Sequence, residues 1–406
     1  MVVETGIAFK LPHPKILGDP MYLTKEEELA LAGEYGYAVQ KAMEILVALG
    51  DVYGADRLIP IKSAQIAGVS YKNIGEAGIE FLRDFVEAGA KVSVYTTLNP
   101  AGIGDEEFMD RQAEIIKLYR RMGVDVTATC TPYYGANLPK FGDHLAWSES
   151  SAVSFANSII GARTNREGGP SSLAAAIVGK TPNYGLHINE NRKATVVVEV
   201  ETELKSFLDY SLLGYHLGKT LESDVPYFRN LKPERLDQLK ELGASMAATG
   251  SIALYHVEGE TPEWKTAIRD KVERIQVGRE ELEDIRERFD TEWREIDAIL
   301  IGCPHASLME IKEVAELLKM RGKPLRIPLF ITTSRAVKAL ADALGYTEVI
   351  ERYNGRLLTD VCLVVSPIRD WYSGIATNSG KAAFYFSSFG LKVRLDDMEK
   401  LMMEAP

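Results

Sequence analysis

The sequence of 406 residues contains only three cysteines and no CxxC or CxxxC pair. A disulfide framework needs a dense, even set of cysteines and a zinc ribbon needs closely spaced pairs, so both are excluded. No apolar run reaches the roughly 18 residues that a membrane-spanning helix requires. The segment MVVETGIAFKLPHP lacks the charged start and apolar stretch of a secretory signal. We therefore expect a cytoplasmic protein.

Basic residues do not outnumber acidic ones in this sequence. The chain has 47 Lys and Arg against 58 Asp and Glu, which gives a net charge of −11. This balance argues against a protein that coats nucleic acid or an anionic membrane surface. Hydrophobic residues make up 46% and charged residues 26%, as in an ordinary globular enzyme, and the length predicts two or three domains.

Predicted helices and strands alternate along the first and last thirds of the chain. This alternation is typical of parallel α/β sheets. The segments are helices over 74–88, 106–122, 308–320 and 335–344, and strands over 91–96, 124–128, 298–301 and 325–331.

Other segments carry weaker signals. Thr24-Lys-Glu-Glu27 matches a capping box and predicts one helix from 24 to about 50. Residues 251–256 predict a short strand, and the charge-rich stretch 270–295 predicts a solvated helix. We expect three regions: an N-terminal α/β region over 1–200, a middle helical and connector region over 201–290, and a C-terminal α/β domain over 291–406.

The segment 131–191 is rich in Gly, Asn, Pro, Ser and Thr. Connections in compact enzymes usually run short, so a long polar segment indicates functional loops. Arg163 and Arg166 lie in it and are candidates for bidentate bonds to an anionic substrate, although exposed arginines are common. Lys381 lies in a Gly-Lys turn that suits a carboxylate or phosphate, with an ordinary surface turn as the alternative.

The three cysteines lie near predicted strand ends. Cys130 and Cys303 each follow a strand, and Cys362 lies at one end of an apolar run. Ligands bind beyond the carboxyl ends of the strands in open α/β sheets, so at least two thiols point to the expected site. Four interpretations remain: inert buried thiols, one nucleophile, a Cys₃ zinc site, or three ligands of a [4Fe–4S] cluster. In the last case the fourth iron acts as a Lewis acid that suits dehydration of a 3-hydroxy acid.

Several segments together resemble the aconitase X family. The most specific are 129–137 (TCTPYYGAN), 142–151 (GDHLAWSESS) and 157–169 (NSIIGARTNREGG). Residues 301–305 (IGCPH) and 378–381 (NSGK) fit the same family, so the resemblance covers nearly the whole chain. Classical aconitases carry two cluster cysteines as a CxxC pair, whereas the three separate cysteines of this chain fit aconitase X.

The resemblance implies an aconitase-like core of three α/β domains without the mobile swivel domain. We expect that domain on a separate small subunit, so the protein is one chain of a heteromer. By the same likeness Cys130, Cys303 and Cys362 hold a [4Fe–4S] cluster. A serine of the swivel domain is the general base in the wider superfamily, so the catalytic base is expected on the partner.

The resemblance also implies a substrate. Archaeal members with a separate large subunit dehydrate (R)-5-phosphomevalonate to trans-anhydromevalonate 5-phosphate, a step of the mevalonate route to isoprenoids. A cis-3-hydroxy-L-proline dehydratase on the same scaffold and a non-catalytic metal-binding scaffold protein are the alternatives. No nucleic acid or membrane partner is expected. The residues that the likeness places against the substrate are Gly68, Val69, Ser70, Asn99, Pro100, Ser150 and Lys381.

Overall fold

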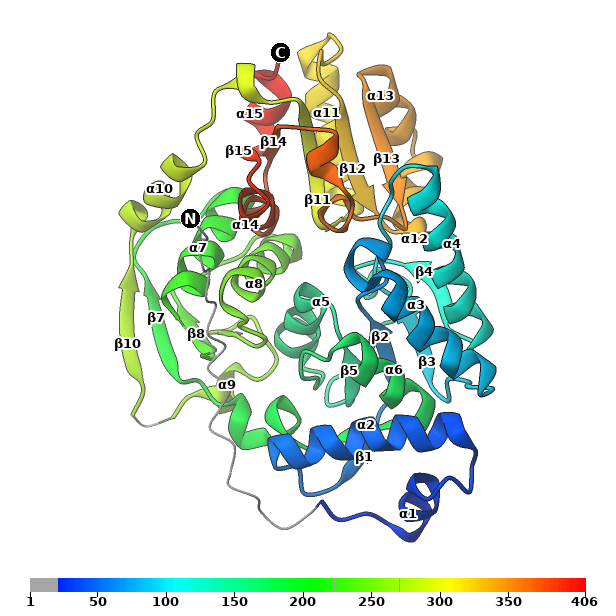
Figure 1. The fold of residues 1–406 in the computed structure, drawn as a ribbon. Coiled ribbons are helices and arrows are strands. Elements are labelled where there is room, and N and C mark those ends of the chain that lie inside the picture. Colours follow the sequence, from blue (N-terminus) through cyan, green and yellow to red (C-terminus); the bar gives the residue numbers. More distant parts are fainter. Residues whose placement is uncertain (1–20, 222–223, 270) are drawn as a thin grey trace, which may run out of the picture.

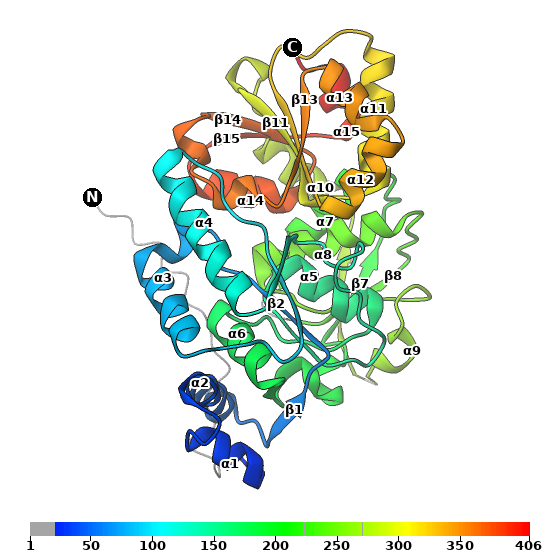
Figure 2. The same ribbon diagram turned by 90° about the vertical axis from the view of Figure 1, so that its right-hand side faces the viewer.

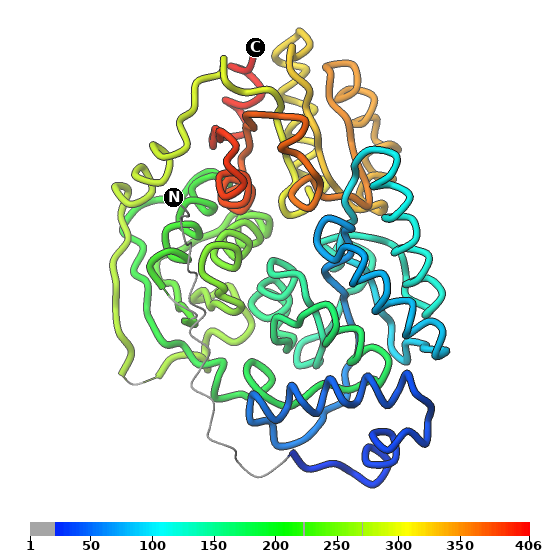
Figure 3. Tube along the Cα trace, viewed as in Figure 1, coloured from blue at the N-terminus to red at the C-terminus, as the bar shows by residue number. Residues whose placement is uncertain are grey.

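The computed structural model of the protein describes residues 21–221, 224–269 and 271–406. It contains three parallel β-sheets flanked by helices. Each sheet with its helices forms one lobe, and the three lobes surround a common centre (Figures 1 and 3). The predicted fold of three α/β units is therefore confirmed. In the described part of the chain, no helix is both long and apolar enough to cross a membrane.

The first lobe is built on a four-stranded sheet of order β4-β3-β2-β5, with every neighbouring pair parallel. A short antiparallel ladder of β1 and β6 lies beside it. Its apolar core includes the fully buried Leu46, Ile66, Ile79 and Ile115. The elements are α1 (Lys25–Leu31), α2 (Tyr37–Tyr53), β1 (Leu58–Pro60), β2 (Ser63–Ile66), α3 (Tyr71–Glu87), β3 (Tyr95–Leu98), α4 (Glu106–Arg121), β4 (Asp125–Ala128), β5 (Leu145–Trp147), α5 (Ser150–Phe155), α6 (Gly169–Val178) and β6 (Lys180–Pro182).

The second lobe has the parallel sheet order β10-β7-β8-β9. Two of its helices, α7 and α8, pack so closely that a Cβ atom on Gly250 would lie 2.1 Å from the carbonyl oxygen of Gly218. Only glycine permits this approach, because any side chain would collide with the facing backbone. The elements are β7 (Val196–Val200), α7 (Phe207–Thr220), β8 (Pro226–Arg229), α8 (Leu236–Gly250), β9 (His256–Val257), α9 (Trp264–Ala267), β10 (Glu273–Val277) and α10 (Arg279–Arg288).

The third lobe contains a five-stranded parallel sheet of order β13-β12-β11-β14-β15. One apolar core runs from the second lobe into the third and includes Leu213, Leu242, Leu300 and Phe386. These two lobes therefore pack as one body. The elements are β11 (Ala298–Ala306), α11 (Leu308–Arg321), β12 (Leu329–Thr333), α12 (Arg335–Ala343), α13 (Tyr346–Arg352), β13 (Gly355–Thr359), β14 (Gly374–Thr377), α14 (Gly380–Ser388), β15 (Lys392–Leu395) and α15 (Met398–Met403).

Three predictions of local structure are wrong. The helix expected over 24–50 is two helices, because Gly33 and Gly36 adopt φ values of 91° and 92° between them. The strand expected over 251–256 is only His256–Val257. The helix expected over 270–295 is the edge strand β10 followed by α10, since one open side of an edge strand tolerates charged residues.

Candidate active site

A cavity of about 410 Å³ lies where the first and third lobes meet. Its walls come from the carboxyl ends of parallel strands in both lobes: the loops after β2, β3, β4 and β5, and the segments around β11, β13 and β14. Figure 2 shows α14 at the boundary between the third lobe and the lobes below it, where it contacts α7 and α8. The cavity therefore occupies the place where open α/β sheets bind their ligands.

The ten residues that the family resemblance placed at the metal or substrate site all line this one cavity. They come from segments up to about three hundred positions apart, and only the fold brings them together. Their individual roles stay predictions. The ten residues are Gly68, Val69, Ser70, Asn99, Pro100, Cys130, Ser150, Cys303, Cys362 and Lys381.

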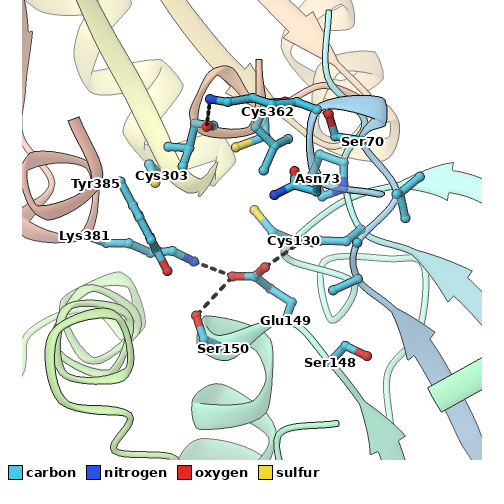
Figure 4. A pocket seen from close by; sticks show the side chains of 18 of the residues that line it. Ser70, Asn73, Cys130, Ser148, Glu149, Ser150, Cys303, Cys362, Lys381 and Tyr385 are labelled. Atoms are coloured by element: carbon cyan, nitrogen blue, oxygen red, sulfur yellow. Dashed lines mark hydrogen bonds and ion pairs between the residues drawn. The ribbon is translucent and has the colours of Figure 1, made fainter. Parts of the chain in front are cut away.

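The three thiols face the cavity from two lobes (Figure 4). Burial raises the pKa of Cys130 to about 12 and the pKa of Cys303 well above its usual range. The pKa of Cys362 is also raised by burial. The thiols are therefore protonated at neutral pH unless a bound cation stabilises their thiolates. No three His, Cys, Asp or Glu side chains of the described residues surround a single point as ligands of one metal ion.

Hydrogen bonds from the first lobe hold the segment that carries Cys362. The Cys362 N–H donates to the carbonyl oxygen of Ala101 at 2.9 Å, and the Ala101 N–H donates to that of Asp360 at 2.8 Å. The hydroxyl of Ser70 donates to the carbonyl oxygen of Val365 at 2.6 Å. Ser70, which the sequence placed against substrate, thus fastens this segment as well.

His305 joins the segments of two cysteines. Its backbone N–H donates to Cys130 Sγ at 3.1 Å, and its Nε2 lies 3.0 Å from the carbonyl oxygen of Val361. A carbonyl only accepts, so Nε2 carries the proton and Nδ1 accepts from the Thr129 hydroxyl, 3.0 Å away. Burial lowers the pKa of His305 to about 4, which keeps the ring neutral and this bonding pattern intact at neutral pH.

A buried ion pair forms one wall of the cavity, and the sequence did not single out its acidic member. The Lys381 ammonium on α14 donates to the Glu149 carboxylate, which precedes α5 (Figure 4). Glu149 also accepts from Asn99 Nδ2 at 2.8 Å and from the Ser151 hydroxyl at 3.1 Å. The segment WSESS was the only signal for Glu149, and nothing in it indicates a partner 232 positions away.

The pair keeps Glu149 ionised. Burial opposes the charge, but the Lys381 ammonium outweighs it and lowers the pKa of Glu149 from 4.5 to about 2. A depressed carboxyl pKa stabilises the fold above the unfolded-state pKa, and this stability is lost as the pH falls toward the folded-state value. Lys381 therefore stays charged and fixed throughout the neutral range.

We predict a matching acid sensitivity. Between pH 6 and pH 3 the protein is expected to lose roughly 2 kcal/mol of stability through Glu149 alone. The variant Glu149→Gln is expected to be less stable than the wild type at pH 6 but to lose less stability between pH 6 and pH 3. Urea unfolding at pH 6 and pH 3 measures the loss of stability in each protein. An equal loss in the wild type and in Glu149→Gln would show that Glu149 does not cause the acid sensitivity.

The two candidate arginines occupy different places. Arg163 donates to the carbonyl oxygen of His187 at 3.2 Å and lies 3.9 Å from the Glu263 carboxylate, away from the cavity lining. Arg166 lines the cavity. Lys72, which the sequence did not indicate, lines it too and donates to the carbonyl oxygen of Ser366 at 2.9 Å.

Comparison with known proteins places this geometry in a family. Models of the aconitase X first, second and third domains match residues 20–190, 194–287 and 296–406. The phosphomevalonate dehydratase large subunit of Thermococcus kodakarensis is 78% identical over 95% of this chain and 100% of that protein. The cis-3-hydroxy-L-proline dehydratase of Hypocrea jecorina is 33% identical over 92% of this chain but 66% of that protein.

A solved structure agrees with these matches. The crystal structure of Thermococcus kodakaraensis aconitase X in its holo-form covers 95% of this chain and 100% of that chain, with a TM-score of 0.94 and 78% identity. The domain matches span nearly all of the sequence, and the similar structure has the same fold over its full length. The chain belongs to the aconitase X family.

Proposed function

We propose that the chain is the large subunit of a hydro-lyase that removes water from (R)-5-phosphomevalonate and forms trans-anhydromevalonate 5-phosphate. The observation that carries the proposal is the meeting of three cysteine thiols and a charged lysine on one cavity. A relative named for this activity is matched over its entire length, which supports the choice of substrate. The reaction belongs to the mevalonate route to isoprenoids.

The chemistry of the thiols fits an iron–sulfur cluster. Cys130, Cys303 and Cys362 face one cavity from two lobes (Figure 4), and three thiolates are the donor set that such a cluster takes. Their raised pKa values call for a cation that stabilises thiolates. When bound by three thiolates, a [4Fe–4S] cluster supplies one iron without a protein ligand, which acts as a Lewis acid toward a carboxylate and a hydroxyl.

The chain's own residues bind and orient the substrate. Lys381, held by Glu149 and 3.2 Å from the Ser151 hydroxyl, is a charged donor in fixed geometry for the hydroxy-acid end of the substrate. The loops of Gly68 to Ser70 and of Asn99 and Pro100 form the facing wall.

A partner chain completes the enzyme in this proposal. The relative matched over its full length is called a large subunit, which implies a small one. The hydroxyproline dehydratase is matched over only 66% of its length, which leaves room for the swivel domain in the same polypeptide. The proton at the carbon next to the carboxylate is then removed by a serine of the small subunit.

Hydroxyproline dehydration is the second candidate, because a dehydratase for that substrate matches 92% of this chain. It is disfavoured by the lower identity of 33% against 78% for the phosphomevalonate enzyme. A non-catalytic metal-binding protein is the third candidate. Its distinguishing property is the absence of turnover with either substrate.

One experiment separates the three candidates. The chain is co-expressed with its small subunit, purified without oxygen and assayed with phosphomevalonate and with cis-3-hydroxy-L-proline. We expect about four irons per large subunit, broad visible absorption and turnover of phosphomevalonate. Turnover of phosphomevalonate by iron-free protein would refute the cluster, and turnover of hydroxyproline alone would refute the substrate.

A further inference from the structure

The cations of the cavity differ in how far their charge is already neutralised. Three cationic side chains line it: Lys72, Arg166 and Lys381. Lys381 is paired with the only carboxylate among the described lining residues, that of Glu149. The charge of Lys381 is therefore balanced before any substrate enters. The remaining positive charge of the cavity resides on Lys72 and Arg166.

Lys72 has most of its hydrogen-bonding capacity in use. Its ammonium donates to the carbonyl oxygens of Val364 and Ser366 at 3.4 and 2.9 Å, and it lies 4.4 Å from the ring centroid of Phe389. An ammonium has three donors, so two of them are committed to the segment that follows Cys362. Lys72 mainly fastens this segment to α3.

Arg166 has most of its donors free. It is exposed, its one hydrogen bond is a long one of 3.5 Å to the carbonyl oxygen of Ala247 on α8, and no carboxylate of the described residues lies within ion-pair distance. A guanidinium offers five N–H donors in a planar fork that matches a phosphate.

The two ends of the cavity also differ. The Lys381 side chain extends from α14 toward Glu149, on the side of the cavity where Cys130 and Cys303 lie (Figure 4). The guanidinium of Arg166 bonds instead to the carbonyl oxygen of Ala247 on α8. The hydroxy-acid end of the substrate must face the thiols, so its other end extends toward a different part of the wall.

We propose that Arg166 binds the phosphate of the substrate through bidentate hydrogen bonds and thereby selects phosphorylated 3-hydroxy acids over uncharged-tail or zwitterionic ones. This inference rests on the proposed function and adds a specificity-determining residue to it. A phosphate carries about −1.5 to −2 charges at neutral pH, which a free guanidinium at the end of the cavity complements.

The test uses the anaerobic two-chain enzyme with the variants Arg166→Gln and Arg166→Lys. Arg166→Gln is expected to raise the KM for phosphomevalonate at least tenfold with little change in kcat, and to weaken competitive inhibition by inorganic phosphate equally. Binding of mevalonate, which lacks the phosphate, is expected to stay unchanged. Arg166→Lys keeps the charge but loses the planar guanidinium fork, so its KM is expected to lie between those of the wild type and Arg166→Gln.

Arg274→Gln is the matched control. Arg274 is exposed, pairs with Glu199 at 3.4 Å and does not line the cavity, so the same charge change there should leave the KM unaltered. Unchanged KM and phosphate inhibition in Arg166→Gln would overturn the inference and leave the proposed function intact. A wild-type enzyme that turns over hydroxyproline but not phosphomevalonate would overturn both.

Discussion

Replacing Lys240 with methionine is expected to lower the free energy of unfolding by about 3–5 kcal/mol, because it leaves the buried Glu310 carboxylate without its cation. Lys240 lies on α8, and its side chain has no exposed surface. It pairs with Glu310 on α11, whose side chain is only 2% exposed, and lies 3.6 Å from Glu241. Equilibrium unfolding in urea measures the loss.

The network around Lys240 explains the size of this effect. Burial alone would lower the pKa of Lys240, but the carboxylates of Glu310 and Glu241 outweigh it and raise the pKa well above its usual range. Burial raises the pKa of Glu241 to about 8, so Glu241 is largely neutral at pH 7. Glu310 also accepts from the Ser307 N–H at 2.9 Å and so caps α11, which begins shortly after Cys303.

Two further variants make the prediction specific. Lys312→Met removes a partly exposed lysine of α11 that pairs with Glu316, and it is expected to change stability by less than about 0.5 kcal/mol. The double variant Lys240→Met, Glu310→Leu removes both buried charges and is expected to regain much of the loss. Equal urea midpoints for Lys240→Met and Lys312→Met would show that the buried ammonium does not stabilise the protein.

The parts of the fold that follow from local pattern were predictable. The capping box at Thr24 is present, and the helix predicted over 106–122 is observed as Glu106–Arg121. The strand β10 was missed because its sequence, ERIQV, carries charges that a helix surface also carries. Pairing with β7 along one edge decides its conformation, and a partner strand some 75 residues earlier is not visible in a local pattern.

The candidate site divides in the same way. Cys130 and Cys303 were recognisable because parallel strands end at one edge of a sheet, so residues after different strands meet there. The importance of Glu149 and Arg166 depends instead on the charged groups around them in the folded protein. The first is matched by a lysine from another lobe, and the second is notable only because no carboxylate of the described residues lies within ion-pair distance of it. Such charge relations arise from tertiary contacts and leave no sequence pattern.

The second large effect is expected at Lys381. Replacement by methionine removes the charged donor next to the three thiols, and kcat/KM for phosphomevalonate is expected to fall at least a hundredfold, as for loss of a preorganised charged donor. The three thiols proposed to hold the cluster are untouched, so iron content and visible absorption are expected to remain. The exposed pair of Lys392 and Glu295 offers the control: Lys392→Met should leave kcat/KM unchanged.

The loss of activity in Lys381→Met could have a structural cause, which has to be separated from a direct role of Lys381 in substrate binding. Lys381→Met also leaves the Glu149 carboxylate buried without its ammonium, which by itself distorts the site. The double variant Lys381→Met, Glu149→Gln removes this unpaired charge and is expected to regain stability in urea but not activity. If activity returned with stability, Lys381 would serve only to neutralise Glu149, and the contact between Lys381 and the substrate would have to be abandoned.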